Sequence, residues 1–193
     1  MKQAALQLNR IRGFTIIELM ITIVVAAVIM TVGVPSFQGL MERNQLTTNI
    51  NQFISSLALA RSEAIKRNQR VVVCPSTNGT SCNNASGYET GWIIFVDRNS
   101  NNSRELANEE LIWEVENIPS NMTLRGSAPY DEAIPYVPSG RLGAINGNVR
   151  LCIDNQTNRA RALTIISSGR VRLADHTTAG VPILSGSAMT DCT

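Results

Sequence analysis

Residues 14 to 35 read FTIIELMITIVVAAVIMTVGVP, and this stretch decides how the rest of the chain is organised. Its only charged residue is Glu18. At about 1.5 Å per residue, a helix of this length crosses roughly 30 Å of hydrocarbon. Lys2, Arg10 and Arg12 precede it, and basic residues are retained on the cytoplasmic side of a membrane. The sequence therefore predicts one transmembrane segment at 14–35, with a cytoplasmic N-terminus and a periplasmic remainder.

Gly13 lies directly before this apolar segment, whereas a conventional secretory signal has its small-residue cleavage site after the apolar core. The sequence GFTIIEL at 13–19 resembles the prepilin signature of type IV pilins and type II secretion pseudopilins. The resemblance implies that a prepilin peptidase at the inner membrane removes a leader at residues 1–13. It also implies that the new N-terminal residue, Phe14, is then N-methylated.

Glu18 is expected to act in assembly, because a carboxylate at membrane depth costs at least about 2.5 kcal/mol on insertion scales. In the family that the signature resembles, its partner is the N-terminal amine of a neighbouring subunit. The alternative is a carboxylate that reaches the nearby interface and has no role in assembly.

Apolar residues between 36 and 68 recur every three or four positions, which is typical of an amphipathic helix. No Pro or Gly interrupts residues 40–68, although Pro35 can kink the chain just before them. We expect an amphipathic stem helix at 36–68, part of one long stem that is half buried in lipid and half covered by the globular domain. The residues of the apolar face are Phe37, Leu40, Met41, Ile50, Phe53, Ile54, Leu57, Ala58, Ala64 and Ile65. The sequence ARSEAIKRN at 60–68 resembles the stem end of the GspH/FimT family of minor pilins and pseudopilins.

Residues 69–193 contain short β-branched runs separated by Gly, Pro, Asn and Ser, a pattern that predicts mostly antiparallel strands. The segment GWIIFVDRN at 91–99 again resembles the GspH/FimT domain. The predicted fold is α+β, with one long N-terminal helix packed on a small β-rich periplasmic domain. The seven expected strands are residues 71–74, 92–96, 111–115, 122–124, 149–153, 162–166 and 171–173.

Four cysteines occur at positions 74, 82, 152 and 192, without a C-x-x-C pair, and His176 is the only histidine. This pattern does not make a zinc site. An even number of cysteines behind a membrane-insertion signal indicates disulfides formed in an oxidising compartment. Three connectivities are possible, and we expect Cys74 to pair with Cys82 and Cys152 with Cys192.

The sequence carries no phosphate-binding loop or metal-ligand cluster, and His176 has no nucleophile at motif spacing. We therefore expect no enzyme activity, no metal and no cofactor. Trp92 and Phe95 lie at strand spacing, and we expect them to pack in the core rather than to form a stacking platform for bases.

The sequence SGRVRL at 168–173 places Arg170 and Arg172 on one face of a strand, with Val171 and Leu173 toward the core. If residues 161–166 and 170–174 form a hairpin, Arg159 and Arg161 join them in one basic region.

Guanidinium groups are good phosphate ligands because their planar donors match oxygen pairs. The pattern Gly-Arg-x-Arg resembles a motif of FimT-type minor pilins that binds DNA during natural transformation. The resemblance implies that Arg170 and Arg172 are the main contacts and Arg159 and Arg161 auxiliary ones. Arginines that serve solubility or contacts between pilins are the alternative.

Together these features predict a minor pilin that is processed by prepilin peptidase, held in the inner membrane and assembled with major and minor pilins by lateral packing of stems. Three roles remain open at this point. They are DNA capture by a transformation pilus, a priming or adaptor subunit of a motility pilus, and a type II secretion pseudopilin.

Overall fold

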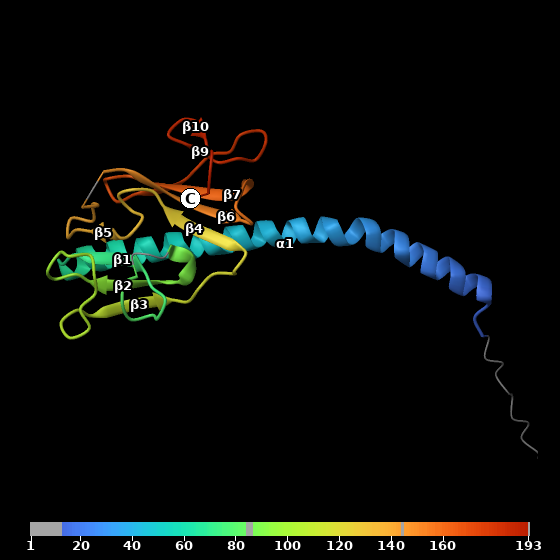
Figure 1. Ribbon diagram of the computed structural model, residues 1–193, viewed down its shortest axis with the longest axis horizontal. Helices are drawn as coiled ribbons and strands as arrows, with labels where there is room; N and C mark the ends of the chain where they lie inside the picture. Colours follow the sequence, from blue (N-terminus) through green and yellow to red (C-terminus); the bar gives the residue numbers. More distant parts are fainter. Residues whose placement is uncertain (1–12, 84–86, 144, 193) are drawn as a thin grey trace, which may run out of the picture. The chain divides into compact units, whose positions relative to one another are not determined.

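The computed structural model describes residues 13–83, 87–143 and 145–192, apart from the side chains of residues 32–36 (Figure 1). The predicted leader therefore lies outside the described residues except for Gly13, as do Lys2, Arg10 and Arg12. The chain divides into two compact units, Met1–Met41 and Glu42–Thr193, and each is described by itself below.

Helix α1 runs from Ile16 to Arg67, so one helix contributes to both units. At its start, the backbone N–H of Glu18 donates to the Thr15 hydroxyl at 3.3 Å. At its end, Lys66 and Arg67 occupy the last turn, where cations favour the helix dipole. Asn68 follows with φ of 52°, a left-handed conformation that commonly ends a helix. The predicted end of the stem at residue 68 is correct to within one residue.

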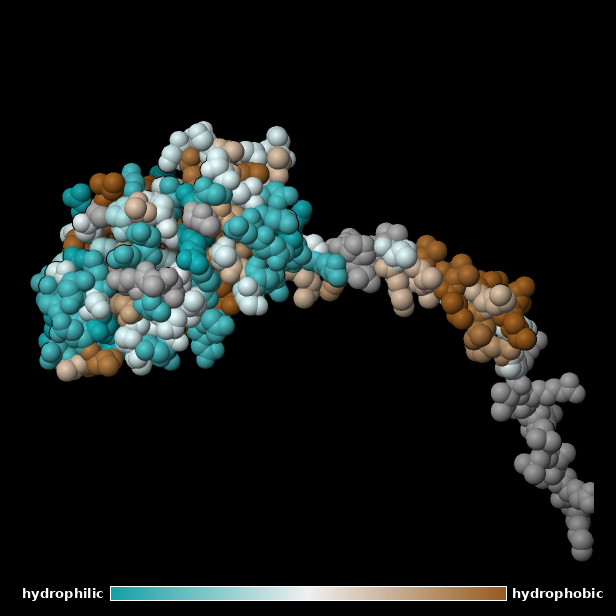
Figure 2. Space-filling model, viewed as in Figure 1, coloured by the Kyte–Doolittle hydropathy of each residue, from teal (hydrophilic) through white to brown (hydrophobic). Residues whose placement is uncertain are grey.

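In the first unit, residues 14–31 expose large apolar side chains, from Phe14 at 81% to Met30 at 65%. Figure 2 shows these hydrophobic side chains gathered along the segment. Within the described residues, no helix reaches the length and apolarity that crossing a membrane requires. The transmembrane segment at 14–35 therefore stays a prediction.

In the second unit, α1 buries a single face, formed by Leu46, Ile50, Phe53, Leu57, Ala60 and Ala64. Phe37, Leu40 and Met41 belong to the first unit and are exposed, and their burial in lipid stays a prediction. The predicted apolar face is wrong at Ala58 and Ile65, which are exposed in the second unit. Ile65, at 52%, follows Ala64 by one residue and so lies about 100° around the helix from the buried face.

Two four-stranded antiparallel sheets pack with this part of α1, in the strand orders β3-β2-β1-β5 and β4-β6-β7-β8. A two-stranded ribbon, β9 with β10, follows. The strands are β1 (Val71–Pro75), β2 (Trp92–Val96), β3 (Leu111–Val115), β4 (Met122–Gly126), β5 (Ile134–Tyr136), β6 (Gly147–Ile153), β7 (Gln156–Ile165), β8 (Val171–Leu173), β9 (Ile183–Leu184) and β10 (Ser187–Ala188).

All seven predicted strands are present, and the α+β fold is confirmed. The pattern missed β5, β9, β10 and a short 3-10 helix, η1 (Tyr88–Thr90). These elements have only two or three residues each, too few to show a period, whereas β8, which is equally short, is marked by the Ser-Ser-Gly turn before it. It also placed the start of β7 six residues late, because Gln156, Thr157 and Asn158 are polar and resemble a loop.

The main core joins α1 to both sheets. The ring of Phe53 packs edge-on against Tyr88 and Trp92, with centroids 5.1 and 5.2 Å away. Trp92 also donates from Nε1 to the Ser56 hydroxyl at 3.0 Å, which satisfies its buried polar atom. Phe95 is buried on the other face of β2, beside Cys74 and Ala133. Both aromatic residues of β2 are therefore core residues, as predicted.

All residues of the three core clusters lie between Leu46 and Cys192. A fragment that begins at Glu42 thus contains the complete core of the second unit, and nothing in that core is contributed by residues 13–41. Because burial of apolar surface is the main favourable term in folding, we expect this fragment to fold alone.

The structure forms the disulfides Cys74–Cys82 and Cys152–Cys192, the pairing expected from the sequence. The first closes a short loop after β1. The second joins β6 to the segment after β10, where Cys152 and Cys192 pack in a small cluster with Ala160, Ala162, Leu184 and Met189.

Candidate functional site

The candidate site is the hairpin of β7 and β8, which carries the Gly-Arg-x-Arg sequence. Ile165 is paired with Val171, Thr164 with Arg172 and Leu163 with Leu173. The turn is closed by the N–H of Ile166, which donates to the carbonyl of Arg170 at 2.9 Å. This is the hairpin that the sequence predicted, with Ser167, Ser168 and Gly169 at its tip.

Gly169 is required at this tip for two reasons. Its φ of +80° is a conformation that residues with a Cβ rarely adopt. A Cβ at this position would also lie 2.0 Å from the carbonyl oxygen of Gly140, in the neighbouring turn. The glycine of the motif therefore lets the two turns pack closely together, and this contact sets the position of the two arginines that follow it.

Arg61 of α1 holds these two turns together. Its Nε donates to the carbonyl of Gly140 at 2.8 Å, and an Nη donates to the carbonyl of Ser168 at 3.3 Å. Sequence reasoning assigned it no role, because its partners lie 79 and 107 residues away along the chain. The nearest signal was its place inside the ARSEAIKRN segment.

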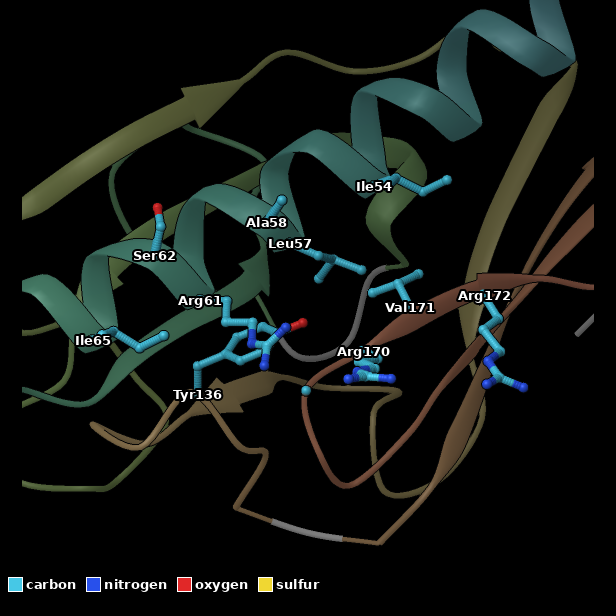
Figure 3. Close-up of a pocket in the computed structure, with 11 residues that line it drawn as sticks. Ile54, Leu57, Ala58, Arg61, Ser62, Ile65, Tyr136, Arg170, Val171 and Arg172 are labelled. Atoms are coloured by element: carbon cyan, nitrogen blue, oxygen red, sulfur yellow. The ribbon is translucent and has the colours of Figure 1, made fainter.

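Arg170 and Arg172 are both exposed. Within the described part of the chain, neither side chain forms an ion pair or hydrogen bond. Figure 3 shows Val171 pointing toward Ile54 and Leu57 of α1, while Arg170 and Arg172 point away from the helix. Leu173 is 52% exposed, so the expectation that it faces the core is wrong. It is the last residue of an edge strand and lies beyond the main cluster, which Val171 does contact.

Arg159 and Arg161 are engaged elsewhere. Arg159 forms ion pairs with Glu42 of α1 and with Asp154, the latter at 3.0 Å. Nη1 of Arg161 lies 3.0 Å from Nε2 of His176. The hairpin therefore presents two free guanidinium groups rather than four, because the two upstream arginines already have partners.

A groove of about 570 Å³ lies between α1 and this hairpin. Its lining contains three arginines and no carboxylate. The hydroxyl of Tyr136, a fully buried residue of the lining, has no hydrogen-bond partner among the described residues, and burial raises the pKa of this phenol well above its usual value. The lining residues are Ile54, Leu57, Ala58, Arg61, Ser62, Ile65, Tyr136, Gly169, Arg170, Val171 and Arg172.

The predicted processing and assembly residues lie at the beginning of the described chain. Gly13 and Phe14 precede α1, and Glu18 is exposed in its first turn without an ion pair to any described residue. Their roles stay predictions. Among the residues that the structure describes, no group of His, Cys, Asp and Glu side chains is arranged to hold a metal ion.

Comparison with protein-family models gives a match to the type II transport protein GspH over residues 49–169, well over half of the chain. The chain belongs to the GspH family. Residues 8–34 match the prokaryotic N-terminal methylation motif. This motif implies processing by a prepilin peptidase and assembly with other pilins. A search of curated proteins gives no match.

Solved structures with the same fold include the type IV minor pilin FimU of Pseudomonas aeruginosa. In one crystal form it is 18% identical, with a TM-score of 0.58, and the match covers 80% of this chain and 99% of that one. A second crystal form gives 17% identity and a TM-score of 0.55, over 77% of this chain and 100% of that one. The minor pseudopilin EpsH of Vibrio cholerae is 13% identical, with a TM-score of 0.46, over 74% and 97%.

The family match and the FimU likeness agree with the fold described above. This GspH-family protein is a minor pilin or pseudopilin, a class of structural subunits. The resemblance that the sequence motifs indicated is thereby confirmed.

Proposed function

We propose that this protein is a minor type IV pilin whose head binds DNA through phosphate contacts made by Arg170 and Arg172. In this proposal residues 1–13 are removed, Phe14 becomes the methylated N-terminus, and residues 14–35 anchor the protein in the inner membrane until it joins a pilus. Residues 36–68 form the stem and residues 69–193 the periplasmic head.

The exposed apolar surface of residues 14–31 supports the assembly part of the proposal. Exposed apolar patches of this extent are rare on soluble monomers and mark contact with a membrane or with other proteins. Before assembly the surface faces lipid, and afterwards it faces the stems of neighbouring subunits. Glu18 forms no ion pair with any residue that the structure describes, so the amine of a neighbouring Phe14 can neutralise it.

The free guanidinium groups of Arg170 and Arg172 are the observation that carries the DNA-binding part. Arg170 directly precedes the edge strand β8 and Arg172 lies within it. Both follow a turn whose position Gly169 and the hydrogen bonds of Arg61 fix. Arg141, in the turn joined to this hairpin by the Leu142 N–H and the Ser167 carbonyl at 3.0 Å, is exposed and adds a third unpaired cation nearby. Cations fixed in this way suit phosphate oxygens and read no base sequence.

Binding of the fragment 42–193 to fluorescent duplex DNA, followed by anisotropy over a range of salt concentrations, tests the proposal. With two or three phosphate contacts, log K should fall against log salt with a slope of about −2 to −3. The double variant Arg170→Ala/Arg172→Ala should make this slope shallower, between about −1 and 0, and weaken binding at least about tenfold.

A matched control is Arg43→Ala/Arg98→Ala, which removes the same charge from two exposed arginines outside the hairpin. It should bind almost as well as the parent. If both double variants lose the same affinity, binding follows net charge alone and the assigned site is wrong. If the parent shows no salt-dependent binding, the DNA role fails altogether.

A type II secretion pseudopilin is the second candidate, because the matching family model describes a type II transport protein. Deletion of the gene separates the two functions. Loss of DNA uptake with normal protein secretion supports the first candidate, and the reverse result supports the second.

A further inference from the structure

The sheet β4-β6-β7-β8, which carries the arginine hairpin, has two different faces. One face packs in the main core with α1, and Leu163 and Ile165 of β7 belong to it. Side chains alternate between the faces along a strand, and paired residues share a face. Arg172 is paired with Thr164, which lies between these two core residues, so Arg172 belongs to the face opposite α1. This outer face contains, on β6 and β7, the residues Asn148, Arg150, Cys152, Ala160, Ala162 and Thr164.

Residues 175–192, which we call the strap, cover part of the outer face. Figure 1 shows β9 and β10 on the side of this sheet away from α1. The strap packs on β6 and β7 in a cluster separate from the main core, formed by Cys152, Ala160, Ala162, Leu184, Met189 and Cys192. Because Ala162 is two residues from Thr164, the covered area begins about 7 Å from the row that contains Arg172.

The end of the strap is attached to β6 by a disulfide and an ion pair. Cys192 is bonded to Cys152, and Asp191 pairs with Arg150 at 2.6 Å. Among the described strands, β9 and β10 pair only with each other. No described residue after Val171 belongs to the main core. The strap therefore lies on a head whose main core is complete without it.

The ion pair changes the charge of the outer face. Arg150 and Arg172 lie on this face two strands apart, with their Cα atoms about 12 Å from each other at the usual strand spacing and rise. Asp191, whose side chain is 52% exposed, places a carboxylate beside Arg150. This carboxylate repels phosphate, and exposed charges act over about 10 Å at 0.1 M salt. The strap thus offsets one cation of the face and also covers the surface beside it.

We infer that the strap is an autoinhibitory segment that limits the contact between the arginine hairpin and DNA. The inference rests on the proposed DNA binding. With the strap in place, DNA meets Arg170 and Arg172 at the edge of the outer face. Displacement of the strap uncovers β6 and β7 and makes Arg150 accessible as a further phosphate contact, since guanidinium groups suit phosphate oxygens.

Variants of the fragment 42–193 test the inference in the anisotropy titration with duplex DNA. Cys152→Ser/Cys192→Ser releases the end of the strap, and the fragment 42–174 with Cys152→Ser lacks the strap. Both should bind DNA at least about threefold more tightly. Their log–log salt slope should be steeper than that of the parent by about 0.9, the value of one more phosphate contact on duplex DNA.

Asp191→Asn keeps the disulfide and tests the ion pair in a head that retains both of its cross-links. It should increase affinity in the same direction by a smaller factor. Its matched control is Glu116→Gln, which removes one exposed carboxylate next to β3, in the other sheet. The control for the cysteine variant is Cys74→Ser/Cys82→Ser, which opens the disulfide loop after β1. Both controls should bind DNA as the parent does.

Limited proteolysis with mass spectrometry measures release of the strap without DNA. Cleavage within residues 175–192 should be faster in Cys152→Ser/Cys192→Ser than in the parent, and circular dichroism should show that the rest of the head stays folded. A parent that binds DNA, together with strap variants that bind no more tightly, overturns the inference and leaves the proposed function intact. Salt-dependent binding that appears only without the strap supports both. Absence of salt-dependent binding in the parent and in every variant overturns both.

Discussion

Two stretches of α1 use similar residues for opposite purposes. Residues 14–31 expose their apolar side chains on all sides, with Ile16, Ile23 and Ile29 all above 60%. Residues 46–64 bury one apolar face, completely at Phe53, Leu57 and Ala60. The backbone is helical in both. The comparison teaches that apolar composition alone does not bury a helix: only the second stretch has sheets packed against it, and the first leaves its apolar side chains exposed.

The carboxylates of the two stretches differ in the same way. Glu63 contacts Arg67 and Lys66, and its hydrogen bond with Arg67 lowers the pKa of Glu63. Glu18 has no such partner within the described chain. The charge of Glu63 is thus balanced by cations of its own helix, whereas that of Glu18 is not balanced by any described residue.

Removal of residues 1–41 should produce the largest change. The full chain should float with lipid vesicles, and the fragment 42–193 should stay in solution, with a partition difference above about a hundredfold, given the apolar area lost. The free energy of unfolding of the head should change by less than about 1 kcal/mol, since no core residue is removed. Flotation and urea denaturation measure the two quantities. A fragment that floats, or that is unfolded, contradicts the division into two stretches.

Phe53→Ala should destabilise the head by about 3 to 5 kcal/mol, because it empties the space between Tyr88 and Trp92. Its matched control is Ile23→Ala, which removes an exposed side chain of the first stretch and should change head stability by less than about 0.5 kcal/mol. Urea denaturation of the full chain in detergent, monitored by fluorescence of the buried Trp92, compares them. Equal effects would show that the two stretches unfold as one body.

Alkaline pH should act on the head alone, because its phenols are buried. Burial raises the pKa of Tyr130 to about 12, and it also raises the pKa values of Tyr88 and Tyr136. In the unfolded chain these groups titrate near pH 10. Their contribution to stability is therefore complete below about pH 10 and is lost as pH rises toward 12 and beyond.

Urea denaturation at several values between pH 8 and 11.5 follows this loss, and Tyr130→Phe should make the decline less steep. Stability that does not change over this range contradicts the assignment. Helical content of residues 14–31 in vesicles should be unaffected, since this stretch has no tyrosine.

Replacing either of the two carboxylates with Ala should have the smallest effect on the stability of the head, but it separates a role in folding from a role in assembly. Glu63→Ala should cost less than about 1 kcal/mol, as is usual for partly exposed ion pairs within a helix, and should leave assembly intact. Glu18→Ala should leave head stability unchanged and reduce the amount recovered in sheared filaments. Immunoblotting of filament and membrane fractions measures this. Normal incorporation of Glu18→Ala would mean that the carboxylate is only tolerated.

The sequence predicted those features that arise from local patterns. The long helix, the seven predicted strands and the β7–β8 hairpin follow from periodicity and turn residues, and the motifs identified the family. Features that depend on distant contacts were missed. Arg61 gave no signal because carbonyl groups, which every residue has, are its partners. The spacing of the arginines could not show that Arg159 forms ion pairs with Glu42 and Asp154. The exposure of Leu173 could not be predicted either, because it depends on where β8 ends.

The position of Arg61 has a mechanical consequence, because this residue belongs to α1 and is hydrogen-bonded to the turn that precedes Arg170. A pull along α1 reaches this turn directly through the bonds to Gly140 and Ser168, whereas the covalent path passes through most of the head. A force applied along the helix therefore reaches the turn that precedes Arg170 and Arg172 through two hydrogen bonds to backbone carbonyls, in addition to the core that α1 shares with both sheets.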